Sequence, residues 1–479
     1  MNTTIIIKTL LTHPCVKPVC LALINIALLN AGLISAPQTA HAKTIQAAEP
    51  IKTTTTSPLA SQVEDQQIIE FKAIELPELV DKSFEKITLL AVKNGLLIPV
   101  PHQFEDVDEN GQSWFKEDNT PLLGREGIVD PHDSLFFRYA DTGQRIDAFN
   151  SGFTRITAEI QVLSSQTNEI RYLYVSDQLT GFQYKPLTQY DQKAGIIKSD
   201  YFTLHTNPED FLSWNDFTYS SYQGEQQNSL LDTLKFRMAA GVLFNSATIT
   251  LDNNDIKTEV LAVKQGPIRT IILAKSHLTF AAIPVVFLDI RFNVFPQQFN
   301  IVVNVEVPAI ISTVLSSPQA TISIDGNNLL GSNVLTAFNP STPTQVDGHM
   351  SDREKELLTH TVNNGESWVW LGTNAGFDIY TELHVPSNFK APISLHYVDD
   401  LRLEEKPERF VGQGPNIGYK IHQIPINETF RFQFDAYFSD TINGVTPQEF
   451  AFRIKDIPAV ASQPIADEFN IAQDTTNTN

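Results

Sequence analysis

The chain has 479 residues, of which 42% are apolar and 10% aromatic, and this composition can fill the cores of two or three domains. Its formal net charge of −21 argues against nucleic acid or an anionic membrane surface as a partner, since these are bound through Lys and Arg, and it permits divalent cations. Both cysteines, Cys15 and Cys20, lie near the N-terminus, so the rest of the chain has no disulfide, thiolate metal site or Cys nucleophile.

Residues 1–42 have the features of a signal peptide. Lys8 and Lys17 supply positive charge, Val19–Ile34 is an apolar run, and Ala40-His41-Ala42 has the small-x-small pattern of a cleavage site. The apolar run is shorter than the ~20 residues of a spanning helix, which makes a membrane anchor the weaker alternative. We therefore expect cleavage near Ala42 and a periplasmic or secreted protein that is not membrane-embedded. A large exported chain without disulfides favours a Gram-negative envelope.

Residues 43–66 are rich in Thr, Ala and Pro without an apolar period, and they are expected to form a disordered linker. The folded part opens with residues 67–150, where two Asn-Gly turns separate three predicted strands at Ile87–Lys93, Leu96–Phe104 and Gln112–Lys116. Asn-Gly favours the type I′ turn of a two-residue hairpin. We therefore expect an antiparallel β-meander at this place.

Apolar and polar residues continue to alternate through the rest of the chain. In Phe430–Phe438 four Phe rings face one way, as in a half-buried strand, whereas runs such as Val285–Phe295 indicate strands covered on both faces. One helix is expected at Asp352–Thr361, capped by Ser351 with Glu354 three residues later. The pattern predicts an all-β fold of two or three antiparallel β-sandwich units with few short helices. The central sandwich is expected at 151–310, the C-terminal sandwich at 311–466 and a flexible tail at 467–479.

The second Asn-Gly turn matches the calcium-loop pattern D-x-[DN]-x-[DN]-G-x5-E. Asp106, Asp108, Asn110 and Glu117 would supply side-chain oxygens, and Gln112 a backbone carbonyl. Strands rather than helices are expected on both sides, so this would not be an EF-hand. The alternative is a polar hairpin turn in which Asp and Asn serve the turn itself. Calcium is the one cofactor that the sequence suggests.

The histidines form no H-x-H or H-E-x-x-H metal motif. His384 and His396 are expected on strands, and His422 lies nearby with the acidic pairs Asp399-Asp400 and Glu404-Glu405. A His beside a carboxylate could abstract the proton α to a uronate carboxyl group, as a lyase or an epimerase requires. Structural histidines at the surface or the edge of a core are the more common alternative.

The residues after an expected helical turn at Asn207–Asp210 are polar and rich in Ser. They include Trp214, Tyr219 and Tyr222, which could be exposed platforms for the stacking of sugar rings. Trp368 and Trp370 share one face of a predicted strand, which is more typical of a core. No nucleophile elbow, P-loop, dinucleotide fingerprint or kinase motif is present.

Two segments resemble known families. The segments Ile98–Phe104, Asp108–Gly111 and Asp133–Gly143 resemble the opening of a family of exported bacterial proteins of uncharacterised function. Val263–Arg269, which contains Gly-Pro-Ile-Arg before an apolar strand, resembles a strand of galactose-mutarotase-like β-sandwiches, which occur in polysaccharide lyases and other carbohydrate-active proteins. This second resemblance implies a large two-sheet sandwich with a glycan-related role, and it adds Arg269 to the candidate ligand-binding residues.

Two classes of function follow. As a binding protein, the chain would hold an envelope or environmental glycan on exposed aromatic side chains and polar loops. As an enzyme, it would cleave or epimerise a polysaccharide that contains uronate. Because no catalytic constellation can be named from the sequence, glycan binding is the preferred hypothesis and the enzyme is the alternative. The oligomeric state cannot be read from the sequence.

Overall fold

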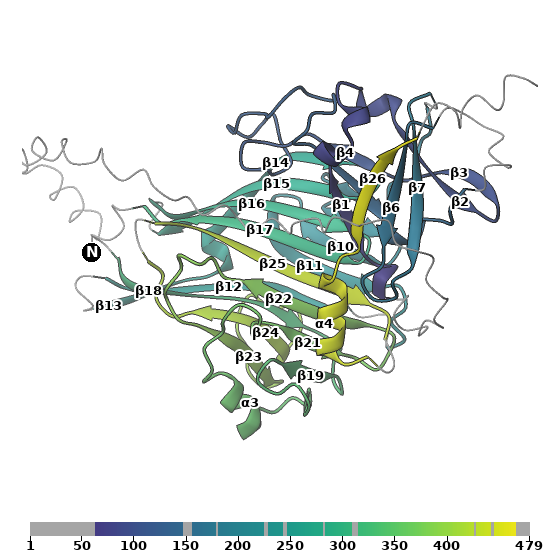
Figure 1. The fold of residues 1–479 in the computed structure, drawn as a ribbon. Helices are drawn as coiled ribbons and strands as arrows, with labels where there is room; N and C mark the ends of the chain where they lie inside the picture. The colour runs from purple at the N-terminus through teal and green to yellow at the C-terminus, as the bar shows by residue number, and fades with distance from the viewer. Residues whose placement is uncertain are drawn as a thin grey trace, which may run out of the picture. The chain divides into compact units, whose positions relative to one another are not determined.

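The computed structural model describes residues 63–146, 156–178, 181–224, 229–242, 247–280, 283–308, 315–425, 428–441 and 445–465. The expected signal peptide with its cleavage site, the tail at 467–479 and most of the linker lie outside these residues. In the described part the fold is all-β, with antiparallel sheets and two short α-helices, which confirms the predicted class (Figure 1). No helix of this part is long and apolar enough to cross a membrane.

The two main sheets form the sandwich. The nine-stranded sheet has the order β14-β15-β16-β17-β25-β22-β21-β19-β20, and the five-stranded sandwich sheet has the order β13-β12-β18-β24-β23. The strands of the larger sheet are β14 (Ile256–Gln265), β15 (Thr270–Phe280), β16 (Ile283–Phe295), β17 (Gln298–Glu306), β25 (Thr429–Ser439), β22 (Asp378–His384), β21 (Val369–Gly372), β19 (Asn333–Thr336) and β20 (Thr344–Gln345). Those of the smaller sheet are β13 (Ala247–Leu251), β12 (Leu231–Val242), β18 (Leu315–Gly326), β24 (Gln413–Ile421) and β23 (Ile393–Asp400).

The alternation in β25 decides which face of the nine-stranded sheet is buried. Phe430, Phe432 and Phe438 belong to the main core with rings from β16 and β17, so the expectation for this strand is confirmed. Phe299 packs edge-on against Phe438, with ring centroids 4.8 Å apart. Since side chains alternate along a strand, the residues between the Phe positions point to the other face of the sheet.

The predicted meander is confirmed for its first turn only. β2 (Thr88–Lys93) and β3 (Leu96–Val100) pair across Asn94 and Gly95, whose φ angles of 53° and 76° fit a type I′ turn. β3 ends at Val100, and β4 (Gln103–Glu105) joins another sheet. The predicted third strand, Gln112–Lys116, is wrong: its only ladder contact is an isolated bridge from Ser113 to Val107.

Three further sheets complete the described part. A three-stranded sheet has the order β1-β5-β4, and a five-stranded sheet has the order β26-β6-β7-β2-β3. The four-stranded sheet has the order β11-β10-β9-β8. Their remaining strands are β1 (Ile68–Lys72), β5 (Ser134–Arg138), β6 (Ala158–Leu163), β7 (Ile170–Ser176), β8 (Thr188–Asp191), β9 (Ile196–Ser199), β10 (Phe202–Asn207), β11 (Asp210–Tyr219) and β26 (Ala459–Pro464).

The expected helical turn at Asn207–Asp210 is wrong, because these residues form the turn of the β10–β11 hairpin. The carboxamide of Asn207 accepts a hydrogen bond from the backbone N–H of Glu209 at 2.9 Å, as in an Asx turn. The polar segment that follows is therefore a strand, β11, and not a loop.

Helix α3 (Asp352–Leu357) confirms the predicted capping box of Ser351 and Glu354, although it ends before Thr361. Helix α4 (Pro447–Lys455) was not expected. Its N-cap is Thr446, whose hydroxyl accepts from the N–H of Glu449. Pro447 follows at the first helical position. Thr-Pro with an acid three residues after the Thr is a helix-start signal that the sequence offered.

Segments far apart in the sequence are joined by hydrogen bonds. β17 pairs with β25 and β12 pairs with β18, so strands from both sides of the predicted boundary at 310/311 share sheets. β26, near the C-terminus, pairs with β6 of the first half. Val63, at the end of the expected linker, is fully buried in a cluster with Trp370 and Phe450. The first half and the sandwich thus share both an edge strand and a piece of core.

Candidate functional site

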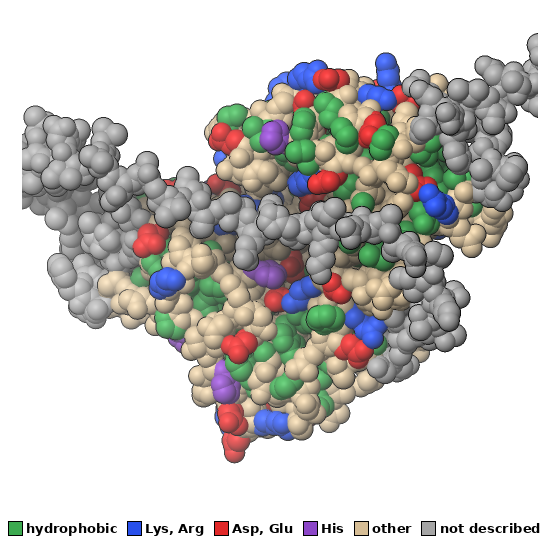
Figure 2. Space-filling model, in the orientation of Figure 1, with side chains coloured by type: hydrophobic (Ala, Val, Ile, Leu, Met, Phe, Trp, Pro, Cys, Tyr) green, Lys and Arg blue, Asp and Glu red, His purple; other side chains and the backbone are tan. Residues whose placement is uncertain are grey.

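The face of the nine-stranded sheet that points away from the main core is rich in polar side chains over its four central strands. Directly paired residues on neighbouring strands share a face. The register therefore aligns Asn293, Asn300, Asp435 and Glu382 in one row across β16, β17, β25 and β22. We call the set of polar side chains on these strands the polar face: Asp289, Arg291, Asn293, Asn300, Asn304, Glu382, His384, Arg431, Gln433 and Asp435. Figure 2 shows basic, acidic and histidine side chains on the visible side of the molecule.

His384 and Asp435 form the centre of the polar face. Nε2 of His384 lies 2.8 Å from Oδ2 of Asp435, although the two residues are 51 positions apart in the sequence. The side chain of Asp435 is 9% exposed and that of His384 is 39% exposed. The hydrogen bond from Asp435 raises the pKa of His384, and burial opposes this effect. The pair is thus an imidazole that reaches solvent and is oriented by a buried carboxylate.

Amide side chains surround this pair. Asn300 donates through Nδ2 to Oδ1 of Asp435 at 2.6 Å, and Gln433 donates to both carboxylate oxygens at 3.2 Å. Asn293 donates to Oδ1 of Asn300 at 2.9 Å, which extends the chain of bonds to β16. These contacts fix the carboxylate and leave His384 as the accessible end of the network.

Two further charged side chains of the polar face flank this pair. Glu382 accepts from the hydroxyl of Tyr380 at 3.0 Å and is paired with Lys455 of α4, which lies near β22 and β21 (Figure 1). Arg431, paired in register with Asn304, is an exposed cation. Burial and the charge of Arg291 lower the pKa of Arg431, and Asp108 opposes this effect. The polar face thus offers an exposed positive charge beside its donors and acceptors.

The calcium-loop residues lie at the β16 side of this face. Asp108 is fully buried: Oδ1 accepts from the N–H groups of Asn110 and Gln112, and Oδ2 accepts from Arg291 at 2.9 Å. Asp106 instead accepts from Gly127 and has a pKa raised by burial, and Glu117 is exposed.

No group of three Asp, Glu, His or Cys side chains in the described ranges is arranged as a metal site. The structure therefore does not bring the predicted ligands together. Calcium binding stays a prediction that these contacts do not test.

Arg269 is held inside the protein rather than offered to a ligand. Its guanidinium donates to both carboxylate oxygens of Glu105, at 2.8 and 2.6 Å, and lies 4.0 Å from the centroid of the Phe136 ring. Burial alone would raise the pKa of Glu105, but the charge and hydrogen bonds of Arg269 outweigh burial and lower it. This bidentate pair anchors β4 to the start of β15.

The expected exposure of Trp214, Tyr219 and Tyr222 is wrong. Trp214 and Tyr219 lie on β11 and are 5% exposed, and Tyr222 is 8% exposed. All three belong to the main core, where Tyr219 packs against Phe377 with ring centroids 4.8 Å apart. They are not surface platforms for sugar rings. Trp368 and Trp370 are buried as well, as expected, beneath α4.

The other candidate histidines do not join the polar face. His422 contacts Ser394 through Nε2 at 2.8 Å, and burial lowers the pKa of His396. Asp399 accepts from the N–H groups of Asp347 and Gly348, and Asp400 pairs with Arg402. Of the histidine–acid combinations that the sequence suggested, His396 with Glu405 interacts through charge, since Glu405 opposes the lowering of the pKa of His396 by burial. The pair that forms, His384 with Asp435, could only have been found by knowing that β22 and β25 are neighbours.

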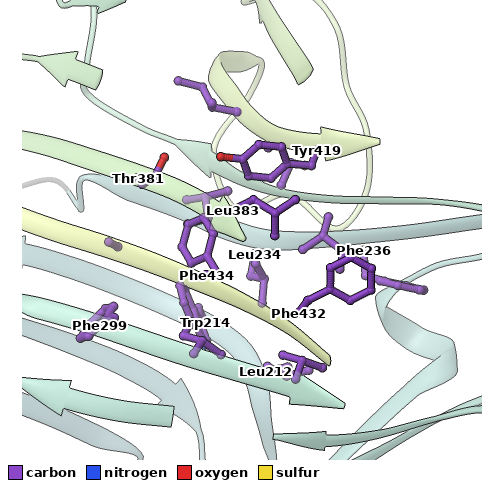
Figure 3. A pocket seen from close by; sticks show the side chains of 18 of the residues that line it. Leu212, Trp214, Leu234, Phe236, Phe299, Thr381, Leu383, Tyr419, Phe432 and Phe434 are labelled. Carbon is purple, nitrogen blue, oxygen red and sulfur yellow. The ribbon is translucent and has the colours of Figure 1, made fainter. Parts of the chain in front are cut away.

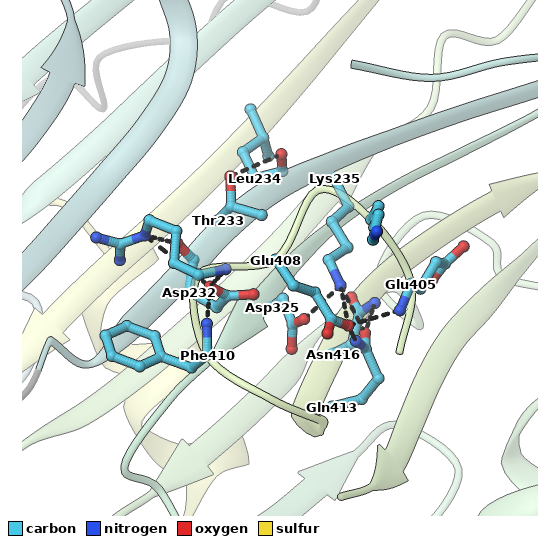
Figure 4. Close-up of polar contacts among 12 residues, drawn as sticks. Asp232, Thr233, Leu234, Lys235, Asp325, Glu405, Glu408, Phe410, Gln413 and Asn416 are labelled. Atoms are coloured by element: carbon cyan, nitrogen blue, oxygen red, sulfur yellow. Dashed lines mark hydrogen bonds and ion pairs between the residues drawn. The ribbon is translucent and has the colours of Figure 1, made fainter. Parts of the chain in front are cut away.

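A second polar cluster lies on the outer face of the five-stranded sandwich sheet (Figure 4). Lys235 is 1% exposed and lies 2.6 Å from Asp325 and 3.3 Å from Glu408. Burial raises the pKa of Asp325 to about 7, with smaller contributions from neighbouring acids. Asp232 accepts from the N–H groups of Arg409 and Phe410, so the segment 401–412 is fastened over the cluster. The cluster is closed off from solvent, and Oδ2 of Asp232, Oδ1 of Asp325 and Oε2 of Glu408 have no hydrogen-bond partner among the described residues.

An apolar cavity of about 330 Å³ lies between the two sandwich sheets (Figure 3). Leu234, Phe236, Leu288, Ile301, Ile324 and Phe434 are among the residues that line it. Ile322 shares the inner face of its sheet with Phe236 and Tyr419, yet 48% of its surface remains accessible.

No family model and no curated protein matches the sequence. Among solved structures, the chain is similar to an alpha-mannosidase from Enterococcus faecalis V583, at 8% identity and a TM-score of 0.43, covering 84% of this chain and 45% of that one. It is also similar to a GalM/aldose epimerase homologue from C. elegans, at 11% identity and a TM-score of 0.32, covering 53% of this chain and 99% of that one.

A galactose 1-epimerase from Lactobacillus acidophilus NCFM is similar at 9% identity and a TM-score of 0.31, covering 60% of this chain and 99% of that one. The chain thus spans less than half the length of the mannosidase. Likenesses this low establish neither a family nor an activity for this chain.

Proposed function

We propose that the protein binds a carbohydrate on the polar face. The observation that carries this proposal is the solvent-reaching imidazole of His384, held by the buried Asp435 among amide side chains of the nine-stranded sheet. Sugar hydroxyl groups both donate and accept, and they are matched by a surface that offers both functions at fixed positions. Arg431 adds an exposed cation, which favours a glycan that carries carboxylate groups.

The expected site of action is the bacterial envelope or its surroundings. The signal-peptide features of residues 1–42 support export, and export would bring the polar face to envelope or environmental glycans. Nucleic acid is not proposed as a partner, because the chain has 34 Lys and Arg against 55 Asp and Glu.

The binding proposal is tested by calorimetry with acidic and neutral polysaccharides on three proteins: wild type, Gln433→Ala and Lys420→Ala. Gln433 is on the polar face, whereas Lys420 is on β24 in the other sheet and serves as the control. We expect an acidic glycan to bind the wild type and Lys420→Ala equally, and Gln433→Ala about tenfold more weakly, the effect of losing one or two hydrogen bonds. Equal affinity of all three variants would place the site elsewhere.

A reaction is the second candidate, and the His384–Asp435 pair favours it. A carboxylate that orients an imidazole is the arrangement of a general acid–base, and a lyase or epimerase that acts on uronate needs such a base with a cation near the carboxyl group. Product with an ultraviolet-absorbing double bond would indicate a lyase. Exchange of the sugar C5 hydrogen for solvent deuterium would indicate an epimerase. His384→Gln should then abolish the reaction and only weaken binding, since Gln keeps a hydrogen-bonding group but cannot act as the base, whereas binding without either signal leaves the non-enzymatic function.

A further inference from the structure

We propose that the cavity between the two sandwich sheets is a binding site for one acyl chain with an uncharged carbonyl group. The site is independent of the polar face, because it lies on the opposite side of the nine-stranded sheet. Its lining comes from inner-face positions of both sandwich sheets, such as Leu234 of β12 and Phe434 of β25 (Figure 3).

The size of the cavity sets the length of the chain. An apolar cavity of about 150 Å³ holds benzene, with its six carbons, so a cavity of about 330 Å³ takes about twice that number, or about twelve carbons. Aliphatic side chains of Leu, Ile and Val dominate the lining, and Phe rings make up much of the rest. A flexible hydrocarbon chain of about ten to twelve carbons is the occupant that fits this volume and lining.

The polar groups of the lining indicate which chemical group the ligand carries at the end of its hydrocarbon chain. No charged side chain of the described residues lines the cavity, so a carboxylate inside it would have no counter-charge. Trp214 lines the cavity, is 5% exposed, and its indole Nε1 lacks a hydrogen-bond partner in the described part of the chain. A buried N–H normally has an acceptor. The carbonyl oxygen of an ester would supply the acceptor without bringing a charge into the cavity.

The chain-length dependence of binding is the first test. The probes are 1-acylglycerols with chains of about eight to sixteen carbons, titrated into the full-length protein. Each methylene group that enters an apolar site should raise the affinity about fourfold, and the gain should stop where the cavity is full. We expect a plateau at about twelve carbons. Affinity that rises steadily through sixteen carbons would indicate a surface site and overturn the proposal, as would the absence of binding.

A filled cavity is the second test. Ile322→Trp places a large ring on the inner face of β18, and Val411→Trp places the same ring on a segment where Val411 is 85% exposed. Circular dichroism establishes that both variants are folded. We expect Ile322→Trp to bind 1-dodecanoylglycerol at least about tenfold more weakly than the wild type, and Val411→Trp to bind it equally. Unchanged binding by a folded Ile322→Trp would exclude the cavity as the site.

The role of Trp214 and the chemistry of the carbonyl are tested together. Trp214→Phe should weaken the binding of 1-dodecanoylglycerol about fivefold and leave dodecane, which has neither an acceptor nor a charge, unaffected. An equal loss with both ligands would show that only packing was changed and would overturn the assigned hydrogen bond. At neutral pH dodecanoate should bind more weakly than the ester, because its carboxylate is unpaired in the cavity. Tighter binding of dodecanoate would instead identify a fatty acid as the ligand and contradict the assignment.

Discussion

Asp108 combines two structural roles in one side chain. One carboxylate oxygen accepts two backbone N–H groups of the turn, and the other pairs with Arg291. Arg291 also pairs with Asp118 at 2.7 Å, so removing Asp108 leaves this guanidinium one counter-charge and mainly deprives the two turn N–H groups of their acceptor. We expect Asp108→Ala to lower the free energy of unfolding by about 1–3 kcal/mol, measured by urea denaturation, and the exposed Glu117→Ala to change it by less than about 0.5 kcal/mol. A similar small effect of both substitutions would contradict the importance of this pair.

The calcium prediction can now be tested sharply, because a cation that uses Asp108 has to compete with Arg291. Calcium at ~100 times its dissociation constant should stabilise the protein by roughly 2.7 kcal/mol. Thermal melts with calcium and with a chelator should therefore differ, and more so for Arg291→Gln than for the wild type. Equal melting temperatures for both proteins would leave the turn stabilised by its own hydrogen bonds alone.

His384 should respond to its partner in a titration. The hydrogen bond with Asp435 raises the pKa of His384 above its ordinary value of 6.5. The pair therefore stabilises the fold most below pH ~6.5, and this contribution is lost as the pH rises through the raised pKa. In NMR titrations of the imidazole we expect Asp435→Asn to lower the pKa of His384. The imidazole resonance that is missing from the spectrum of His384→Gln is the one that belongs to His384. An unchanged pKa in Asp435→Asn would show that the carboxylate does not control the imidazole.

At the scale of elements, the stability of α4 depends on its N-cap residue, Thr446. Thr446 accepts from Glu449, and the helix covers Trp370 and places Lys455 beside Glu382. Loss of an N-cap typically costs about 1 kcal/mol. Urea denaturation should show this loss for Thr446→Ala and little change for Thr446→Ser, which keeps the hydroxyl. An equal loss for both would mean that the methyl group of Thr446 matters and the cap does not.

The segment 401–412 should respond to pH through Asp325. The raised pKa of about 7 means that Asp325 ionises between pH 6 and 8, next to Glu408 and Asp232. The folded state holds this proton more tightly than the unfolded chain, so stability falls as the pH rises from about 4 to 7. Amide exchange at Arg409 and Phe410, corrected for intrinsic rates, should be faster at pH 8 than at pH 6. Asp325→Asn should abolish this difference, and a difference that persists would exclude Asp325 as its source.

Elements with regular alternation were predictable from the sequence, and elements with bulges were not. The strict period of two in β25 gave the right buried face, because every second side chain of a paired strand enters the core. In β11 the buried residues Phe211, Trp214 and Phe217 are three apart, because the β10–β11 register shifts at His205 and Thr206. A search for alternation therefore mistakes this strand for a polar loop and its core aromatics for surface groups.

At the scale of the whole molecule, the candidate site could not be read from the sequence. His384 and Asp435 meet because β22 and β25 pair, and nothing local to either residue indicates that partner. Arg269 stood out for its motif, yet its partner Glu105 lies 164 positions away. Local patterns report on the face of a strand, whereas a site depends on strand order, which arises from long-range pairing.

The described part of the chain should unfold as one unit. β26 links the C-terminus to β6, and Val63 packs with residues of α4 and the nine-stranded sheet. Because these connections share strands and core, we expect thermal unfolding by circular dichroism and by tryptophan fluorescence to give coincident transitions. Two separated transitions would show that the first half and the sandwich are independent.

The pairing of β26 with β6 also has a consequence for the time course of synthesis. Leu163 of β6 cannot pair with Ala459 of β26 until Ala459 has been synthesised, and Ala459 is 296 residues further along the chain. At roughly 5–20 residues per second, the ribosome needs about 15–60 s to make that stretch. During this interval β6 has an open edge, and backbone groups at an open edge attract other strands. A chain whose first sheet is completed only by its last strand has to be protected from premature association until translation is nearly finished.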